Sequence, residues 1–166
     1  RRAHKARVIS VSSVAARNGV IDFDNLNAER RYNPMRIYSQ SKLACLMFAL
    51  ELHRRSEAAG WGVASIASHP GVARTDLIYN APGRQSLLGM TRSTLWFLFQ
   101  PVWQGALPTL FAATSPLARS GAYYGPGGLR EVRGYPASAR IPEAALDIKA
   151  SARLWEASQA LTGVAF

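Results

Sequence analysis

The sequence predicts an α/β fold in which short parallel strands alternate with helices. Two runs rich in β-branched or small apolar residues, 7–13 and 63–68, each end in polar residues, as buried strands do. Between them, apolar side chains recur at helical spacing over residues 33–59, with Pro34 near the start and Gly60 past the end. A strand, a helix and a second strand in this order favour a parallel sheet.

The first strand ends in two hydroxyl side chains, Ser12 and Ser13. In open α/β sheets, ligands bind in the crevice outside the carboxyl ends of the strands, so both serines are candidate site residues. Serines that only end a strand are also common, and the pair alone leaves that structural alternative open.

The helix carries Tyr38 and Lys42, which are four residues apart and therefore share one face. An ammonium beside a phenol favours the phenolate, which makes proton transfer feasible near neutral pH. The pair is thus a candidate proton donor and acceptor. The alternative is a solvated lysine one turn away from a half-buried tyrosine.

The second strand runs into His69, Pro70 and Gly71. Proline fixes the backbone and cannot pair in a central strand, whereas glycine lets a ligand approach the main chain closely. An ordinary Pro-Gly turn is the structural alternative.

In this order, the serine-ended strand, the Tyr-x-x-x-Lys helix and the Pro-Gly-x-x-x-Thr loop resemble the short-chain dehydrogenase/reductase family. The continuation Ser41–Ala44 is similar to the retinol-dehydrogenase-like branch, and the match spans roughly residues 7 to 125. The resemblance implies the C-terminal part of a doubly wound Rossmann-type parallel sheet, with about three strands and flanking helices. Residues 1–166 would then form a partial domain.

The resemblance also implies roles for individual residues. Tyr38 would be the general acid/base, Lys42 would assist it and hold the nicotinamide ribose, and Ser13, rather than Ser12, would hydrogen-bond the substrate oxygen. The implied catalytic residues are Ser13, Tyr38 and Lys42. The implied cofactor-binding residues are Tyr38, Lys42, Pro70, Gly71, Val72 and Thr75.

The implied cofactor is NADP or NAD, with NADP slightly favoured by the resemblance, and the implied substrate is a small hydrophobic alcohol, aldehyde or ketone. The family's G-x-G-x-x-G fingerprint and its Asn-Asn-Ala-Gly element do not occur in these 166 residues. We therefore expect that the dinucleotide-binding N-terminal half, about four strand-helix units, is missing. The intact parent would be an enzyme. The alternative for the chain itself is an inactive fragment that serves as an interaction module or is a remnant.

Residues 72–104 correspond to the substrate lid of the resembled family. Their apolar run, 95–99, has three interpretations: a cover over a hydrophobic substrate, an element that makes peripheral contact with a membrane, or plain core. Arg92 and Pro101 interrupt the region, which is too short to span a bilayer.

The remaining elements follow local patterns. Residues 104–114 predict a helix, residues 121–124 the last parallel strand, and residues 141–161 one terminal helix with Pro142 in its first turn. Residues 20–23 predict a short extended piece.

Composition and motifs argue against several structural and functional classes of protein. The chain is 48% hydrophobic and 18% charged, which is enough to form a core and argues against disorder. Its one cysteine, Cys45, allows no internal disulfide and suits a reducing, cytoplasmic location, and the few histidines form no metal-ligand cluster. The net charge of +10 is scattered, with no basic stripe of the kind that binds nucleic acid. A serine hydrolase built from Ser13, His69 and Asp76 would lack the Gly-x-Ser-x-Gly elbow.

Overall fold

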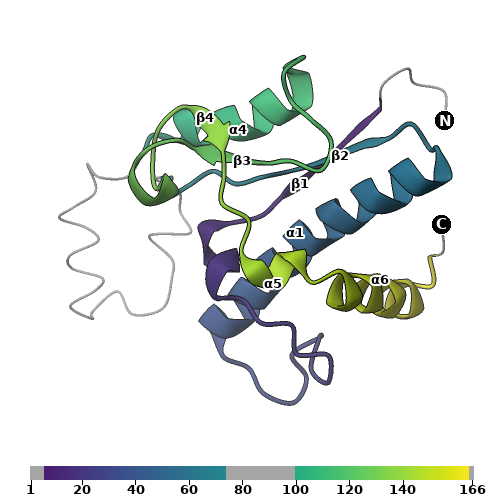
Figure 1. The fold of residues 1–166 in the computed structure, drawn as a ribbon. Coiled ribbons are helices and arrows are strands. Elements are labelled where there is room, and N and C mark those ends of the chain that lie inside the picture. The colour runs from purple at the N-terminus through teal and green to yellow at the C-terminus, as the bar shows by residue number, and fades with distance from the viewer. Residues whose placement is uncertain (1–5, 74–99, 165–166) are drawn as a thin grey trace, which may run out of the picture.

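A computed structural model of the chain describes residues 6–73 and 100–164, and within them a four-stranded sheet lies between two layers of helices. Figure 1 shows α4 (Val102–Thr114) on one face of the sheet and α1 (Pro34–Ala59) on the other. This two-sided cover is what a parallel sheet requires, because both of its faces are apolar.

Three strands are parallel, as the sequence predicts. They are β1 (Arg7–Val11), β2 (Ala64–Ser68) and β3 (Tyr123–Pro126), in the spatial order β1-β2-β3-β4. A fourth strand, β4 (Pro136–Ser138), pairs antiparallel with β3 and was not predicted, because three residues with a proline carry no strand pattern. The sheet is therefore mixed, and three parallel strands set its carboxyl edge.

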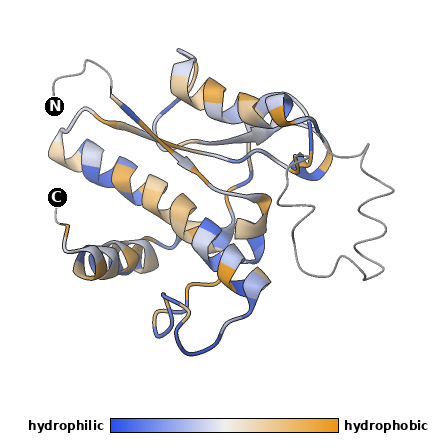
Figure 2. Ribbon diagram, turned by 180° about the vertical axis from the view of Figure 1, so that it is seen from behind, coloured by the Kyte–Doolittle hydropathy of each residue, from blue (hydrophilic) through white to orange (hydrophobic). Residues whose placement is uncertain are grey.

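Helix α1 has the boundaries that its sequence predicts. The side chain of Asn33 caps it by accepting a hydrogen bond from the Arg36 amide at 3.1 Å, Pro34 occupies the first turn, and Gly60 ends it in the left-handed conformation. Hydrophilic and hydrophobic residues alternate along its ribbon in Figure 2. The buried face includes the apolar side chains Leu43, Leu46, Met47 and Leu50.

The prediction of a single C-terminal helix is wrong. The chain instead forms α5 (Glu143–Leu146) and α6 (Ile148–Thr162), separated at Asp147. The Asp147 carboxylate accepts a hydrogen bond from the Ala150 amide at 2.9 Å, so this residue caps α6 rather than continuing α5. Helix α6 then packs against α1, where Trp155 stacks on Phe48 with ring centroids 5.4 Å apart.

The predicted extended piece over residues 20–23 is also not a strand. Its backbone is held by a side chain instead, because the Asp22 amide donates to Gln40 Oε1 at 2.9 Å. Gln40 lies buried on α1, so a side chain of the helix helps to fix the insertion that precedes it. Of the predicted lid, 72–104, residues 74–99 lie outside the described part of the chain.

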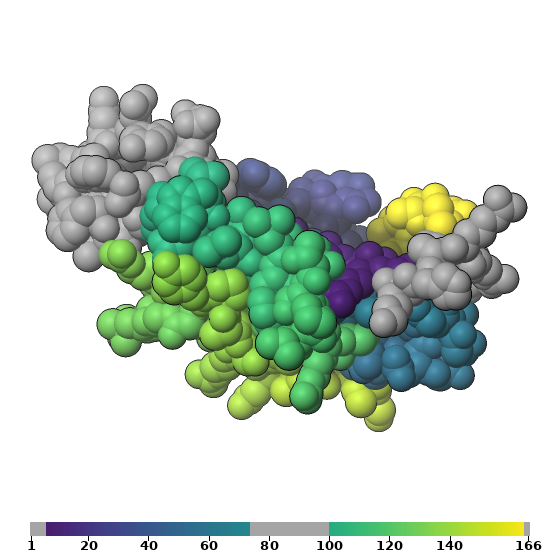
Figure 3. Space-filling model, turned by 90° about the horizontal axis from the view of Figure 1, so that it is seen from above, coloured from purple at the N-terminus to yellow at the C-terminus, as the bar shows by residue number. Residues whose placement is uncertain are grey.

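Strand β1 lies at one edge of the sheet, and among the described residues no strand pairs with its outer side. Val8 and Val11 are 37% and 44% exposed, and part of this N-terminal segment (purple) is in view beside α4 in Figure 3. An exposed edge of this kind offers free backbone donors and acceptors to another strand. No helix within the described ranges has the length and apolarity needed to cross a membrane.

Replacing Leu43 by alanine tests the packing of α1 on the sheet. Leu43 is fully buried, so we expect Leu43→Ala to lower the free energy of unfolding by about 2–5 kcal/mol in urea denaturation. The matched control, Leu129→Ala, removes a leucine that is 87% exposed and should change it by less than about 0.5 kcal/mol. Equal effects of the two substitutions would contradict the assignment of the core.

Candidate active site

The carboxyl ends of the three parallel strands bring the predicted site segments to one edge. Val11, the last residue of β1, is in register with Ser68, the last residue of β2, and Ser68 is in register with Tyr124 of β3. The serine pair that follows β1 and the Pro-Gly loop that follows β2 therefore leave the sheet side by side. This is the edge at which ligands bind in open α/β sheets.

The Tyr38–Lys42 pair of α1 meets the end of β1. The Lys42 Nζ lies 5.9 Å from the centroid of the Tyr38 ring and donates a hydrogen bond to the Val11 carbonyl oxygen at 3.3 Å. Both side chains are half-buried. The ammonium is thus held between the phenol and the strand end, where it can stabilise negative charge on either the tyrosine or a bound ligand.

The two serines have different hydrogen-bonding duties. The Ser12 hydroxyl is buried and donates to the Lys42 carbonyl oxygen at 2.7 Å, which uses its one proton. The Ser13 hydroxyl accepts from the Ala15 amide at 3.2 Å, as the cap of a 3-10 helix, η1 (Val14–Asn18). Because the Ser13 oxygen acts there as an acceptor, its proton is left to donate to a ligand.

Tyr123 supports Ser13 from the core. Its hydroxyl donates to the Ser13 carbonyl oxygen at 3.4 Å, and its ring lies against that of His69, with centroids 5.0 Å apart. Burial raises the pKa of Tyr123 to about 12, so the phenol stays protonated and remains a donor. Tyr123 is thus a second tyrosine near the site, and its role is to hold the Ser13 backbone by a hydrogen bond.

The Pro70-Gly71-Val72 loop is held along its whole length. Gly71 adopts a φ of +64°, and a Cβ there would lie 2.5 Å from the Val132 carbonyl oxygen, so only glycine fits. The Val72 amide donates to the same Val132 oxygen at 2.8 Å, and the Gln100 side-chain amide donates to the Pro70 carbonyl oxygen. The loop that follows β2 is therefore a fixed surface of backbone.

A buried histidine joins this loop to the turn after β3. The Gly71 amide donates to His69 Nδ1 at 3.1 Å, and His69 Nε2 lies 2.9 Å from Glu131 Oε2. Arg17 pairs with the same carboxylate oxygen at 2.6 Å. Burial lowers the pKa of His69 and outweighs the opposing effect of Glu131, so the ring is neutral in the folded protein.

Glu131 was not singled out from the sequence, and its neighbours in the chain gave no reason to do so. The same contacts argue against a serine hydrolase, because both ring nitrogens of His69 are engaged by Gly71 and Glu131 rather than by Ser13. Asp76, the third member of that alternative, lies outside the described residues, as does Thr75. No group of three or more metal-ligating side chains occurs within the described ranges.

One glycine triplet has the spacing G-x-x-x-G-x-G that some dinucleotide-binding turns use: Gly121, Gly125 and Gly127. The fold assigns it another duty. Gly125 lies inside β3, where a methyl group would overlap the ring of His69, and the turn that follows leads into a three-residue 3-10 helix, η3 (Leu129–Glu131). Gly125 makes room for His69 and Gly121 for His53, and the triplet does not form a strand-to-helix phosphate turn.

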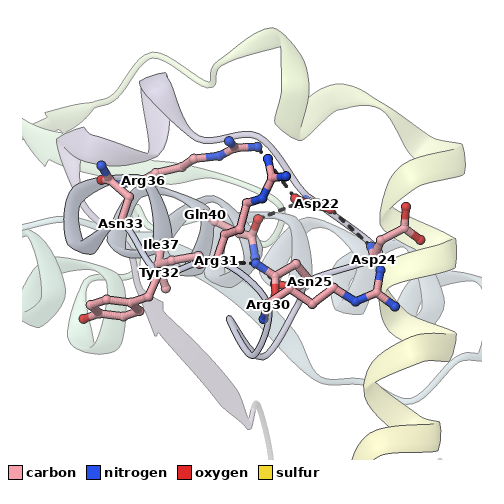
Figure 4. A pocket seen from close by; sticks show the side chains of 10 residues that line it. All are labelled: Asp22, Asp24, Asn25, Arg30, Arg31, Tyr32, Asn33, Arg36, Ile37 and Gln40. Carbon is pink, nitrogen blue, oxygen red and sulfur yellow. Dashed lines mark hydrogen bonds and ion pairs between the residues drawn. The ribbon is translucent and has the colours of Figure 1, made fainter.

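A polar cavity of about 480 Å³ lies between the first turns of α1 and the preceding insertion. Figure 4 shows its lining, in which Arg36 and Gln40 reach toward Asp22, and the Arg36 guanidinium lies 3.7 Å from the Asp22 carboxylate. Neither Tyr38 nor Lys42 lines this cavity. It is therefore distinct from the cluster at the strand ends.

No model of a known protein family matches the chain. Individual proteins do. Human retinol dehydrogenase 13 is 39% identical and human retinol dehydrogenase 14 is 33% identical, each aligned over 96% of this chain. A crystal structure of an uncharacterised protein from Mycobacterium paratuberculosis, 34% identical, superposes on 98% of the chain with a TM-score of 0.74.

These relatives make the chain a homologue of retinol dehydrogenases of the short-chain dehydrogenase/reductase family. The resemblance seen in the motifs, including the retinol-dehydrogenase-like branch, is thereby confirmed, as is the partial Rossmann-type sheet. The chain spans about half the length of these relatives: 46% and 45% of the two retinol dehydrogenases and 52% of the solved chain.

The buried His69 should make stability depend on pH. The unfolded histidine titrates near pH 6.5 and the folded one at a lower pH, so the unfolded state binds more protons between the two pKa values. We expect the free energy of unfolding to fall as the pH is lowered from about 7 through 6.5. His69→Gln should lose less stability than wild type between pH 7.5 and 5.5, measured by urea denaturation. An equal loss in both proteins would contradict this.

Proposed function

We propose that this chain supplies the proton-transfer and substrate-orienting half of an NAD(P)-dependent oxidoreductase that interconverts an alcohol and a carbonyl compound. The observation that carries the proposal is the contact of Lys42 with both the Tyr38 ring and the end of β1. This contact holds a phenol and an ammonium at the end of β1, which Ser13 follows in the chain, and this is the edge at which open α/β sheets bind ligands. The catalytic residues proposed are Ser13, Tyr38 and Lys42.

Each residue has one task in this proposal. Tyr38 donates a proton to the carbonyl oxygen, or takes one from the alcohol. Ser13 donates a hydrogen bond to the same substrate oxygen, with the proton that its helix-capping role leaves free. Lys42 stabilises the phenolate and binds the nicotinamide ribose. The nicotinamide supplies or accepts the hydride when the cofactor is bound.

We propose that the described residues hold the nicotinamide end of such a cofactor. The Pro70-Gly71-Val72 loop offers a fixed backbone surface at the same strand edge where Lys42 contacts β1, which supports the proposal that a nicotinamide ring lies against it, and Thr75 is proposed as a further contact. The G-x-G-x-x-G turn that holds a pyrophosphate is not in this sequence. We therefore propose that an N-terminal half provides it, and that the cofactor is NADP or NAD, with NADP slightly favoured by the family resemblance.

For the substrate we propose a hydrophobic alcohol, aldehyde or ketone. Two relatives are named as dehydrogenases of retinol, which is a hydrophobic alcohol, and this supports the class without naming the compound. Exposed apolar residues of α4, Val102, Trp103 and Leu110, support a further proposal of peripheral membrane contact for a cytoplasmic protein.

The competing proposal is an inactive fragment that serves as an interaction module. Its support is the exposed outer edge of β1 together with the match to only about half of each relative. The two proposals differ in whether a second half completes the site.

Tyr38→Phe tests the proton-transfer role in a full-length protein that carries this chain. The substitution removes only the hydroxyl, so kcat should fall at least about 100-fold while the Kd for the nicotinamide cofactor changes little. Tyr135→Phe, at an exposed tyrosine, is the matched control and should retain full activity. A Tyr38→Phe variant with most of its turnover would contradict the assignment.

Isothermal titration calorimetry tests the need for a second half. The 166-residue chain should show no saturable binding of NADPH or NADH, because the pyrophosphate would have no turn to hold it. A micromolar Kd for either nucleotide would mean that the chain completes the cofactor site by another route, such as assembly with a second polypeptide.

A further inference from the structure

One carboxylate joins the loops that follow all three parallel strands. Glu131 lies in the turn after β3, and its Oε2 atom contacts His69, which follows β2, and Arg17, which lies in η1 after β1. Its other oxygen, Oε1, accepts a hydrogen bond from the Arg140 amide at 2.9 Å, beyond β4. The Glu131 side chain is 17% exposed, so its charge is largely shielded from water and is matched by Arg17.

The hydrogen bonds fix the tautomer of His69. Nδ1 faces the Gly71 N–H and must act as an acceptor, so in the neutral ring the proton is on Nε2. That N–H then donates to Glu131 at 2.9 Å. A carboxylate that holds one ring nitrogen in this way also orients the other, and it thereby sets where the Gly71 amide lies.

The backbone at Glu131 is held in a conformation that side-chain-bearing residues seldom adopt. Arg130 and Glu131 have φ angles of +52° and +58°. Two consecutive residues of this kind cost free energy and persist only where surrounding contacts fix them, a pattern that is common at functional sites. Here the Val132 carbonyl, next in the chain, binds the Val72 amide at 2.8 Å, so the strained turn also holds the Pro-Gly loop directly.

The same carboxylate reaches the substrate side of the site. Arg17 donates to Glu131 and also to the Arg130 carbonyl oxygen at 3.2 Å, which fastens η1 to the turn. Ser13 is the cap of η1, so the position of its hydroxyl depends on that short helix.

We propose that Glu131 is a positioning residue that sets the geometry of the Pro70-Gly71-Val72 loop through His69 and of the Ser13 hydroxyl through Arg17. The inference rests on the proposed function for its catalytic meaning. Glu131 itself touches no reacting atom. It fixes the position of the nicotinamide-facing loop relative to the substrate-facing serine.

Nuclear magnetic resonance of the 166-residue chain tests the structural part, without any cofactor. In wild type, the ¹⁵N shifts of His69 at pH 7.5 should show the proton on Nε2. In Glu131→Ala, exchange of the Gly71 and Val72 amide protons should be at least about tenfold faster. Glu131→Gln keeps an acceptor for Nε2 and should restore much of the protection. Glu57→Ala, at an exposed glutamate of α1, should change exchange less than about twofold.

A proton on Nδ1 in wild type, or unchanged exchange in Glu131→Ala, would overturn the proposal. If Glu131→Ala does not fold, the tautomer of His69 in wild type and the variant Glu131→Arg still test the proposal. A cation at position 131 would repel Arg17 and give His69 no acceptor. Unchanged exchange of the Gly71 and Val72 amide protons in Glu131→Arg would therefore also overturn the proposal.

Kinetics of the full-length protein test the catalytic part. Glu131→Ala should raise the KM for the nicotinamide cofactor at least about tenfold, whereas Glu131→Gln should recover most of it. A KM unchanged in Glu131→Ala would overturn the role of Glu131. Tyr38→Phe that retains turnover would instead overturn the proposed function, so the two failures are distinguishable.

Discussion

The end of β1 is joined to α1 by two hydrogen bonds that run in opposite directions. The Ser12 hydroxyl donates to the Lys42 backbone carbonyl at 2.7 Å, and the Lys42 ammonium donates to the Val11 carbonyl at 3.3 Å. A parallel crossover determines only that the helix returns over the sheet, whereas these bonds determine which turn of α1 lies at the strand end. They bring Tyr38 to the edge where Ser13 and the Pro-Gly loop also lie. Without them the phenol and the ammonium would be a pair on a helix surface.

Around that contact, the site divides into a face made of side chains and a face made of backbone. Ser13, Tyr38 and Lys42 are the side chains proposed to exchange or hold protons, and the loop after β2 offers main chain that is fixed by Gln100, Val132 and His69. Glu131 connects the two faces, because its carboxylate contacts both His69 and Arg17. Such division suits hydride transfer, in which the cofactor carries the electrons and the protein must orient two partners and move one proton.

Local chemistry made most of the fold predictable from the sequence, and the same local patterns predict the candidate residues Ser13, Tyr38 and Lys42, whose catalytic role stays a prediction. Pro34 and Gly60 mark the ends of α1, and runs of β-branched or small apolar residues mark β1 and β2, because each signal depends on neighbours in the chain. The break at Asp147 was missed because an aspartate inside a helical pattern gives no sign of whether it will cap a new helix. Glu131 was missed for a different reason: 62 positions separate it from His69, and only the sheet brings them together. Val8 and Val11 likewise could not be recognised as exposed edge residues from the sequence, because their exposure at the edge of β1 depends on the strand order.

The most direct test of the central claim is a crystal structure of a full-length protein that carries this chain, with NADP or NAD and an unreactive carbonyl analogue bound. The account predicts that the carbonyl oxygen lies about 2.6–3.2 Å from both Tyr38 Oη and Ser13 Oγ, with the nicotinamide against the Pro70-Gly71-Val72 backbone. A carbonyl oxygen bound by other residues, with Tyr38 directed away from it, would contradict the account.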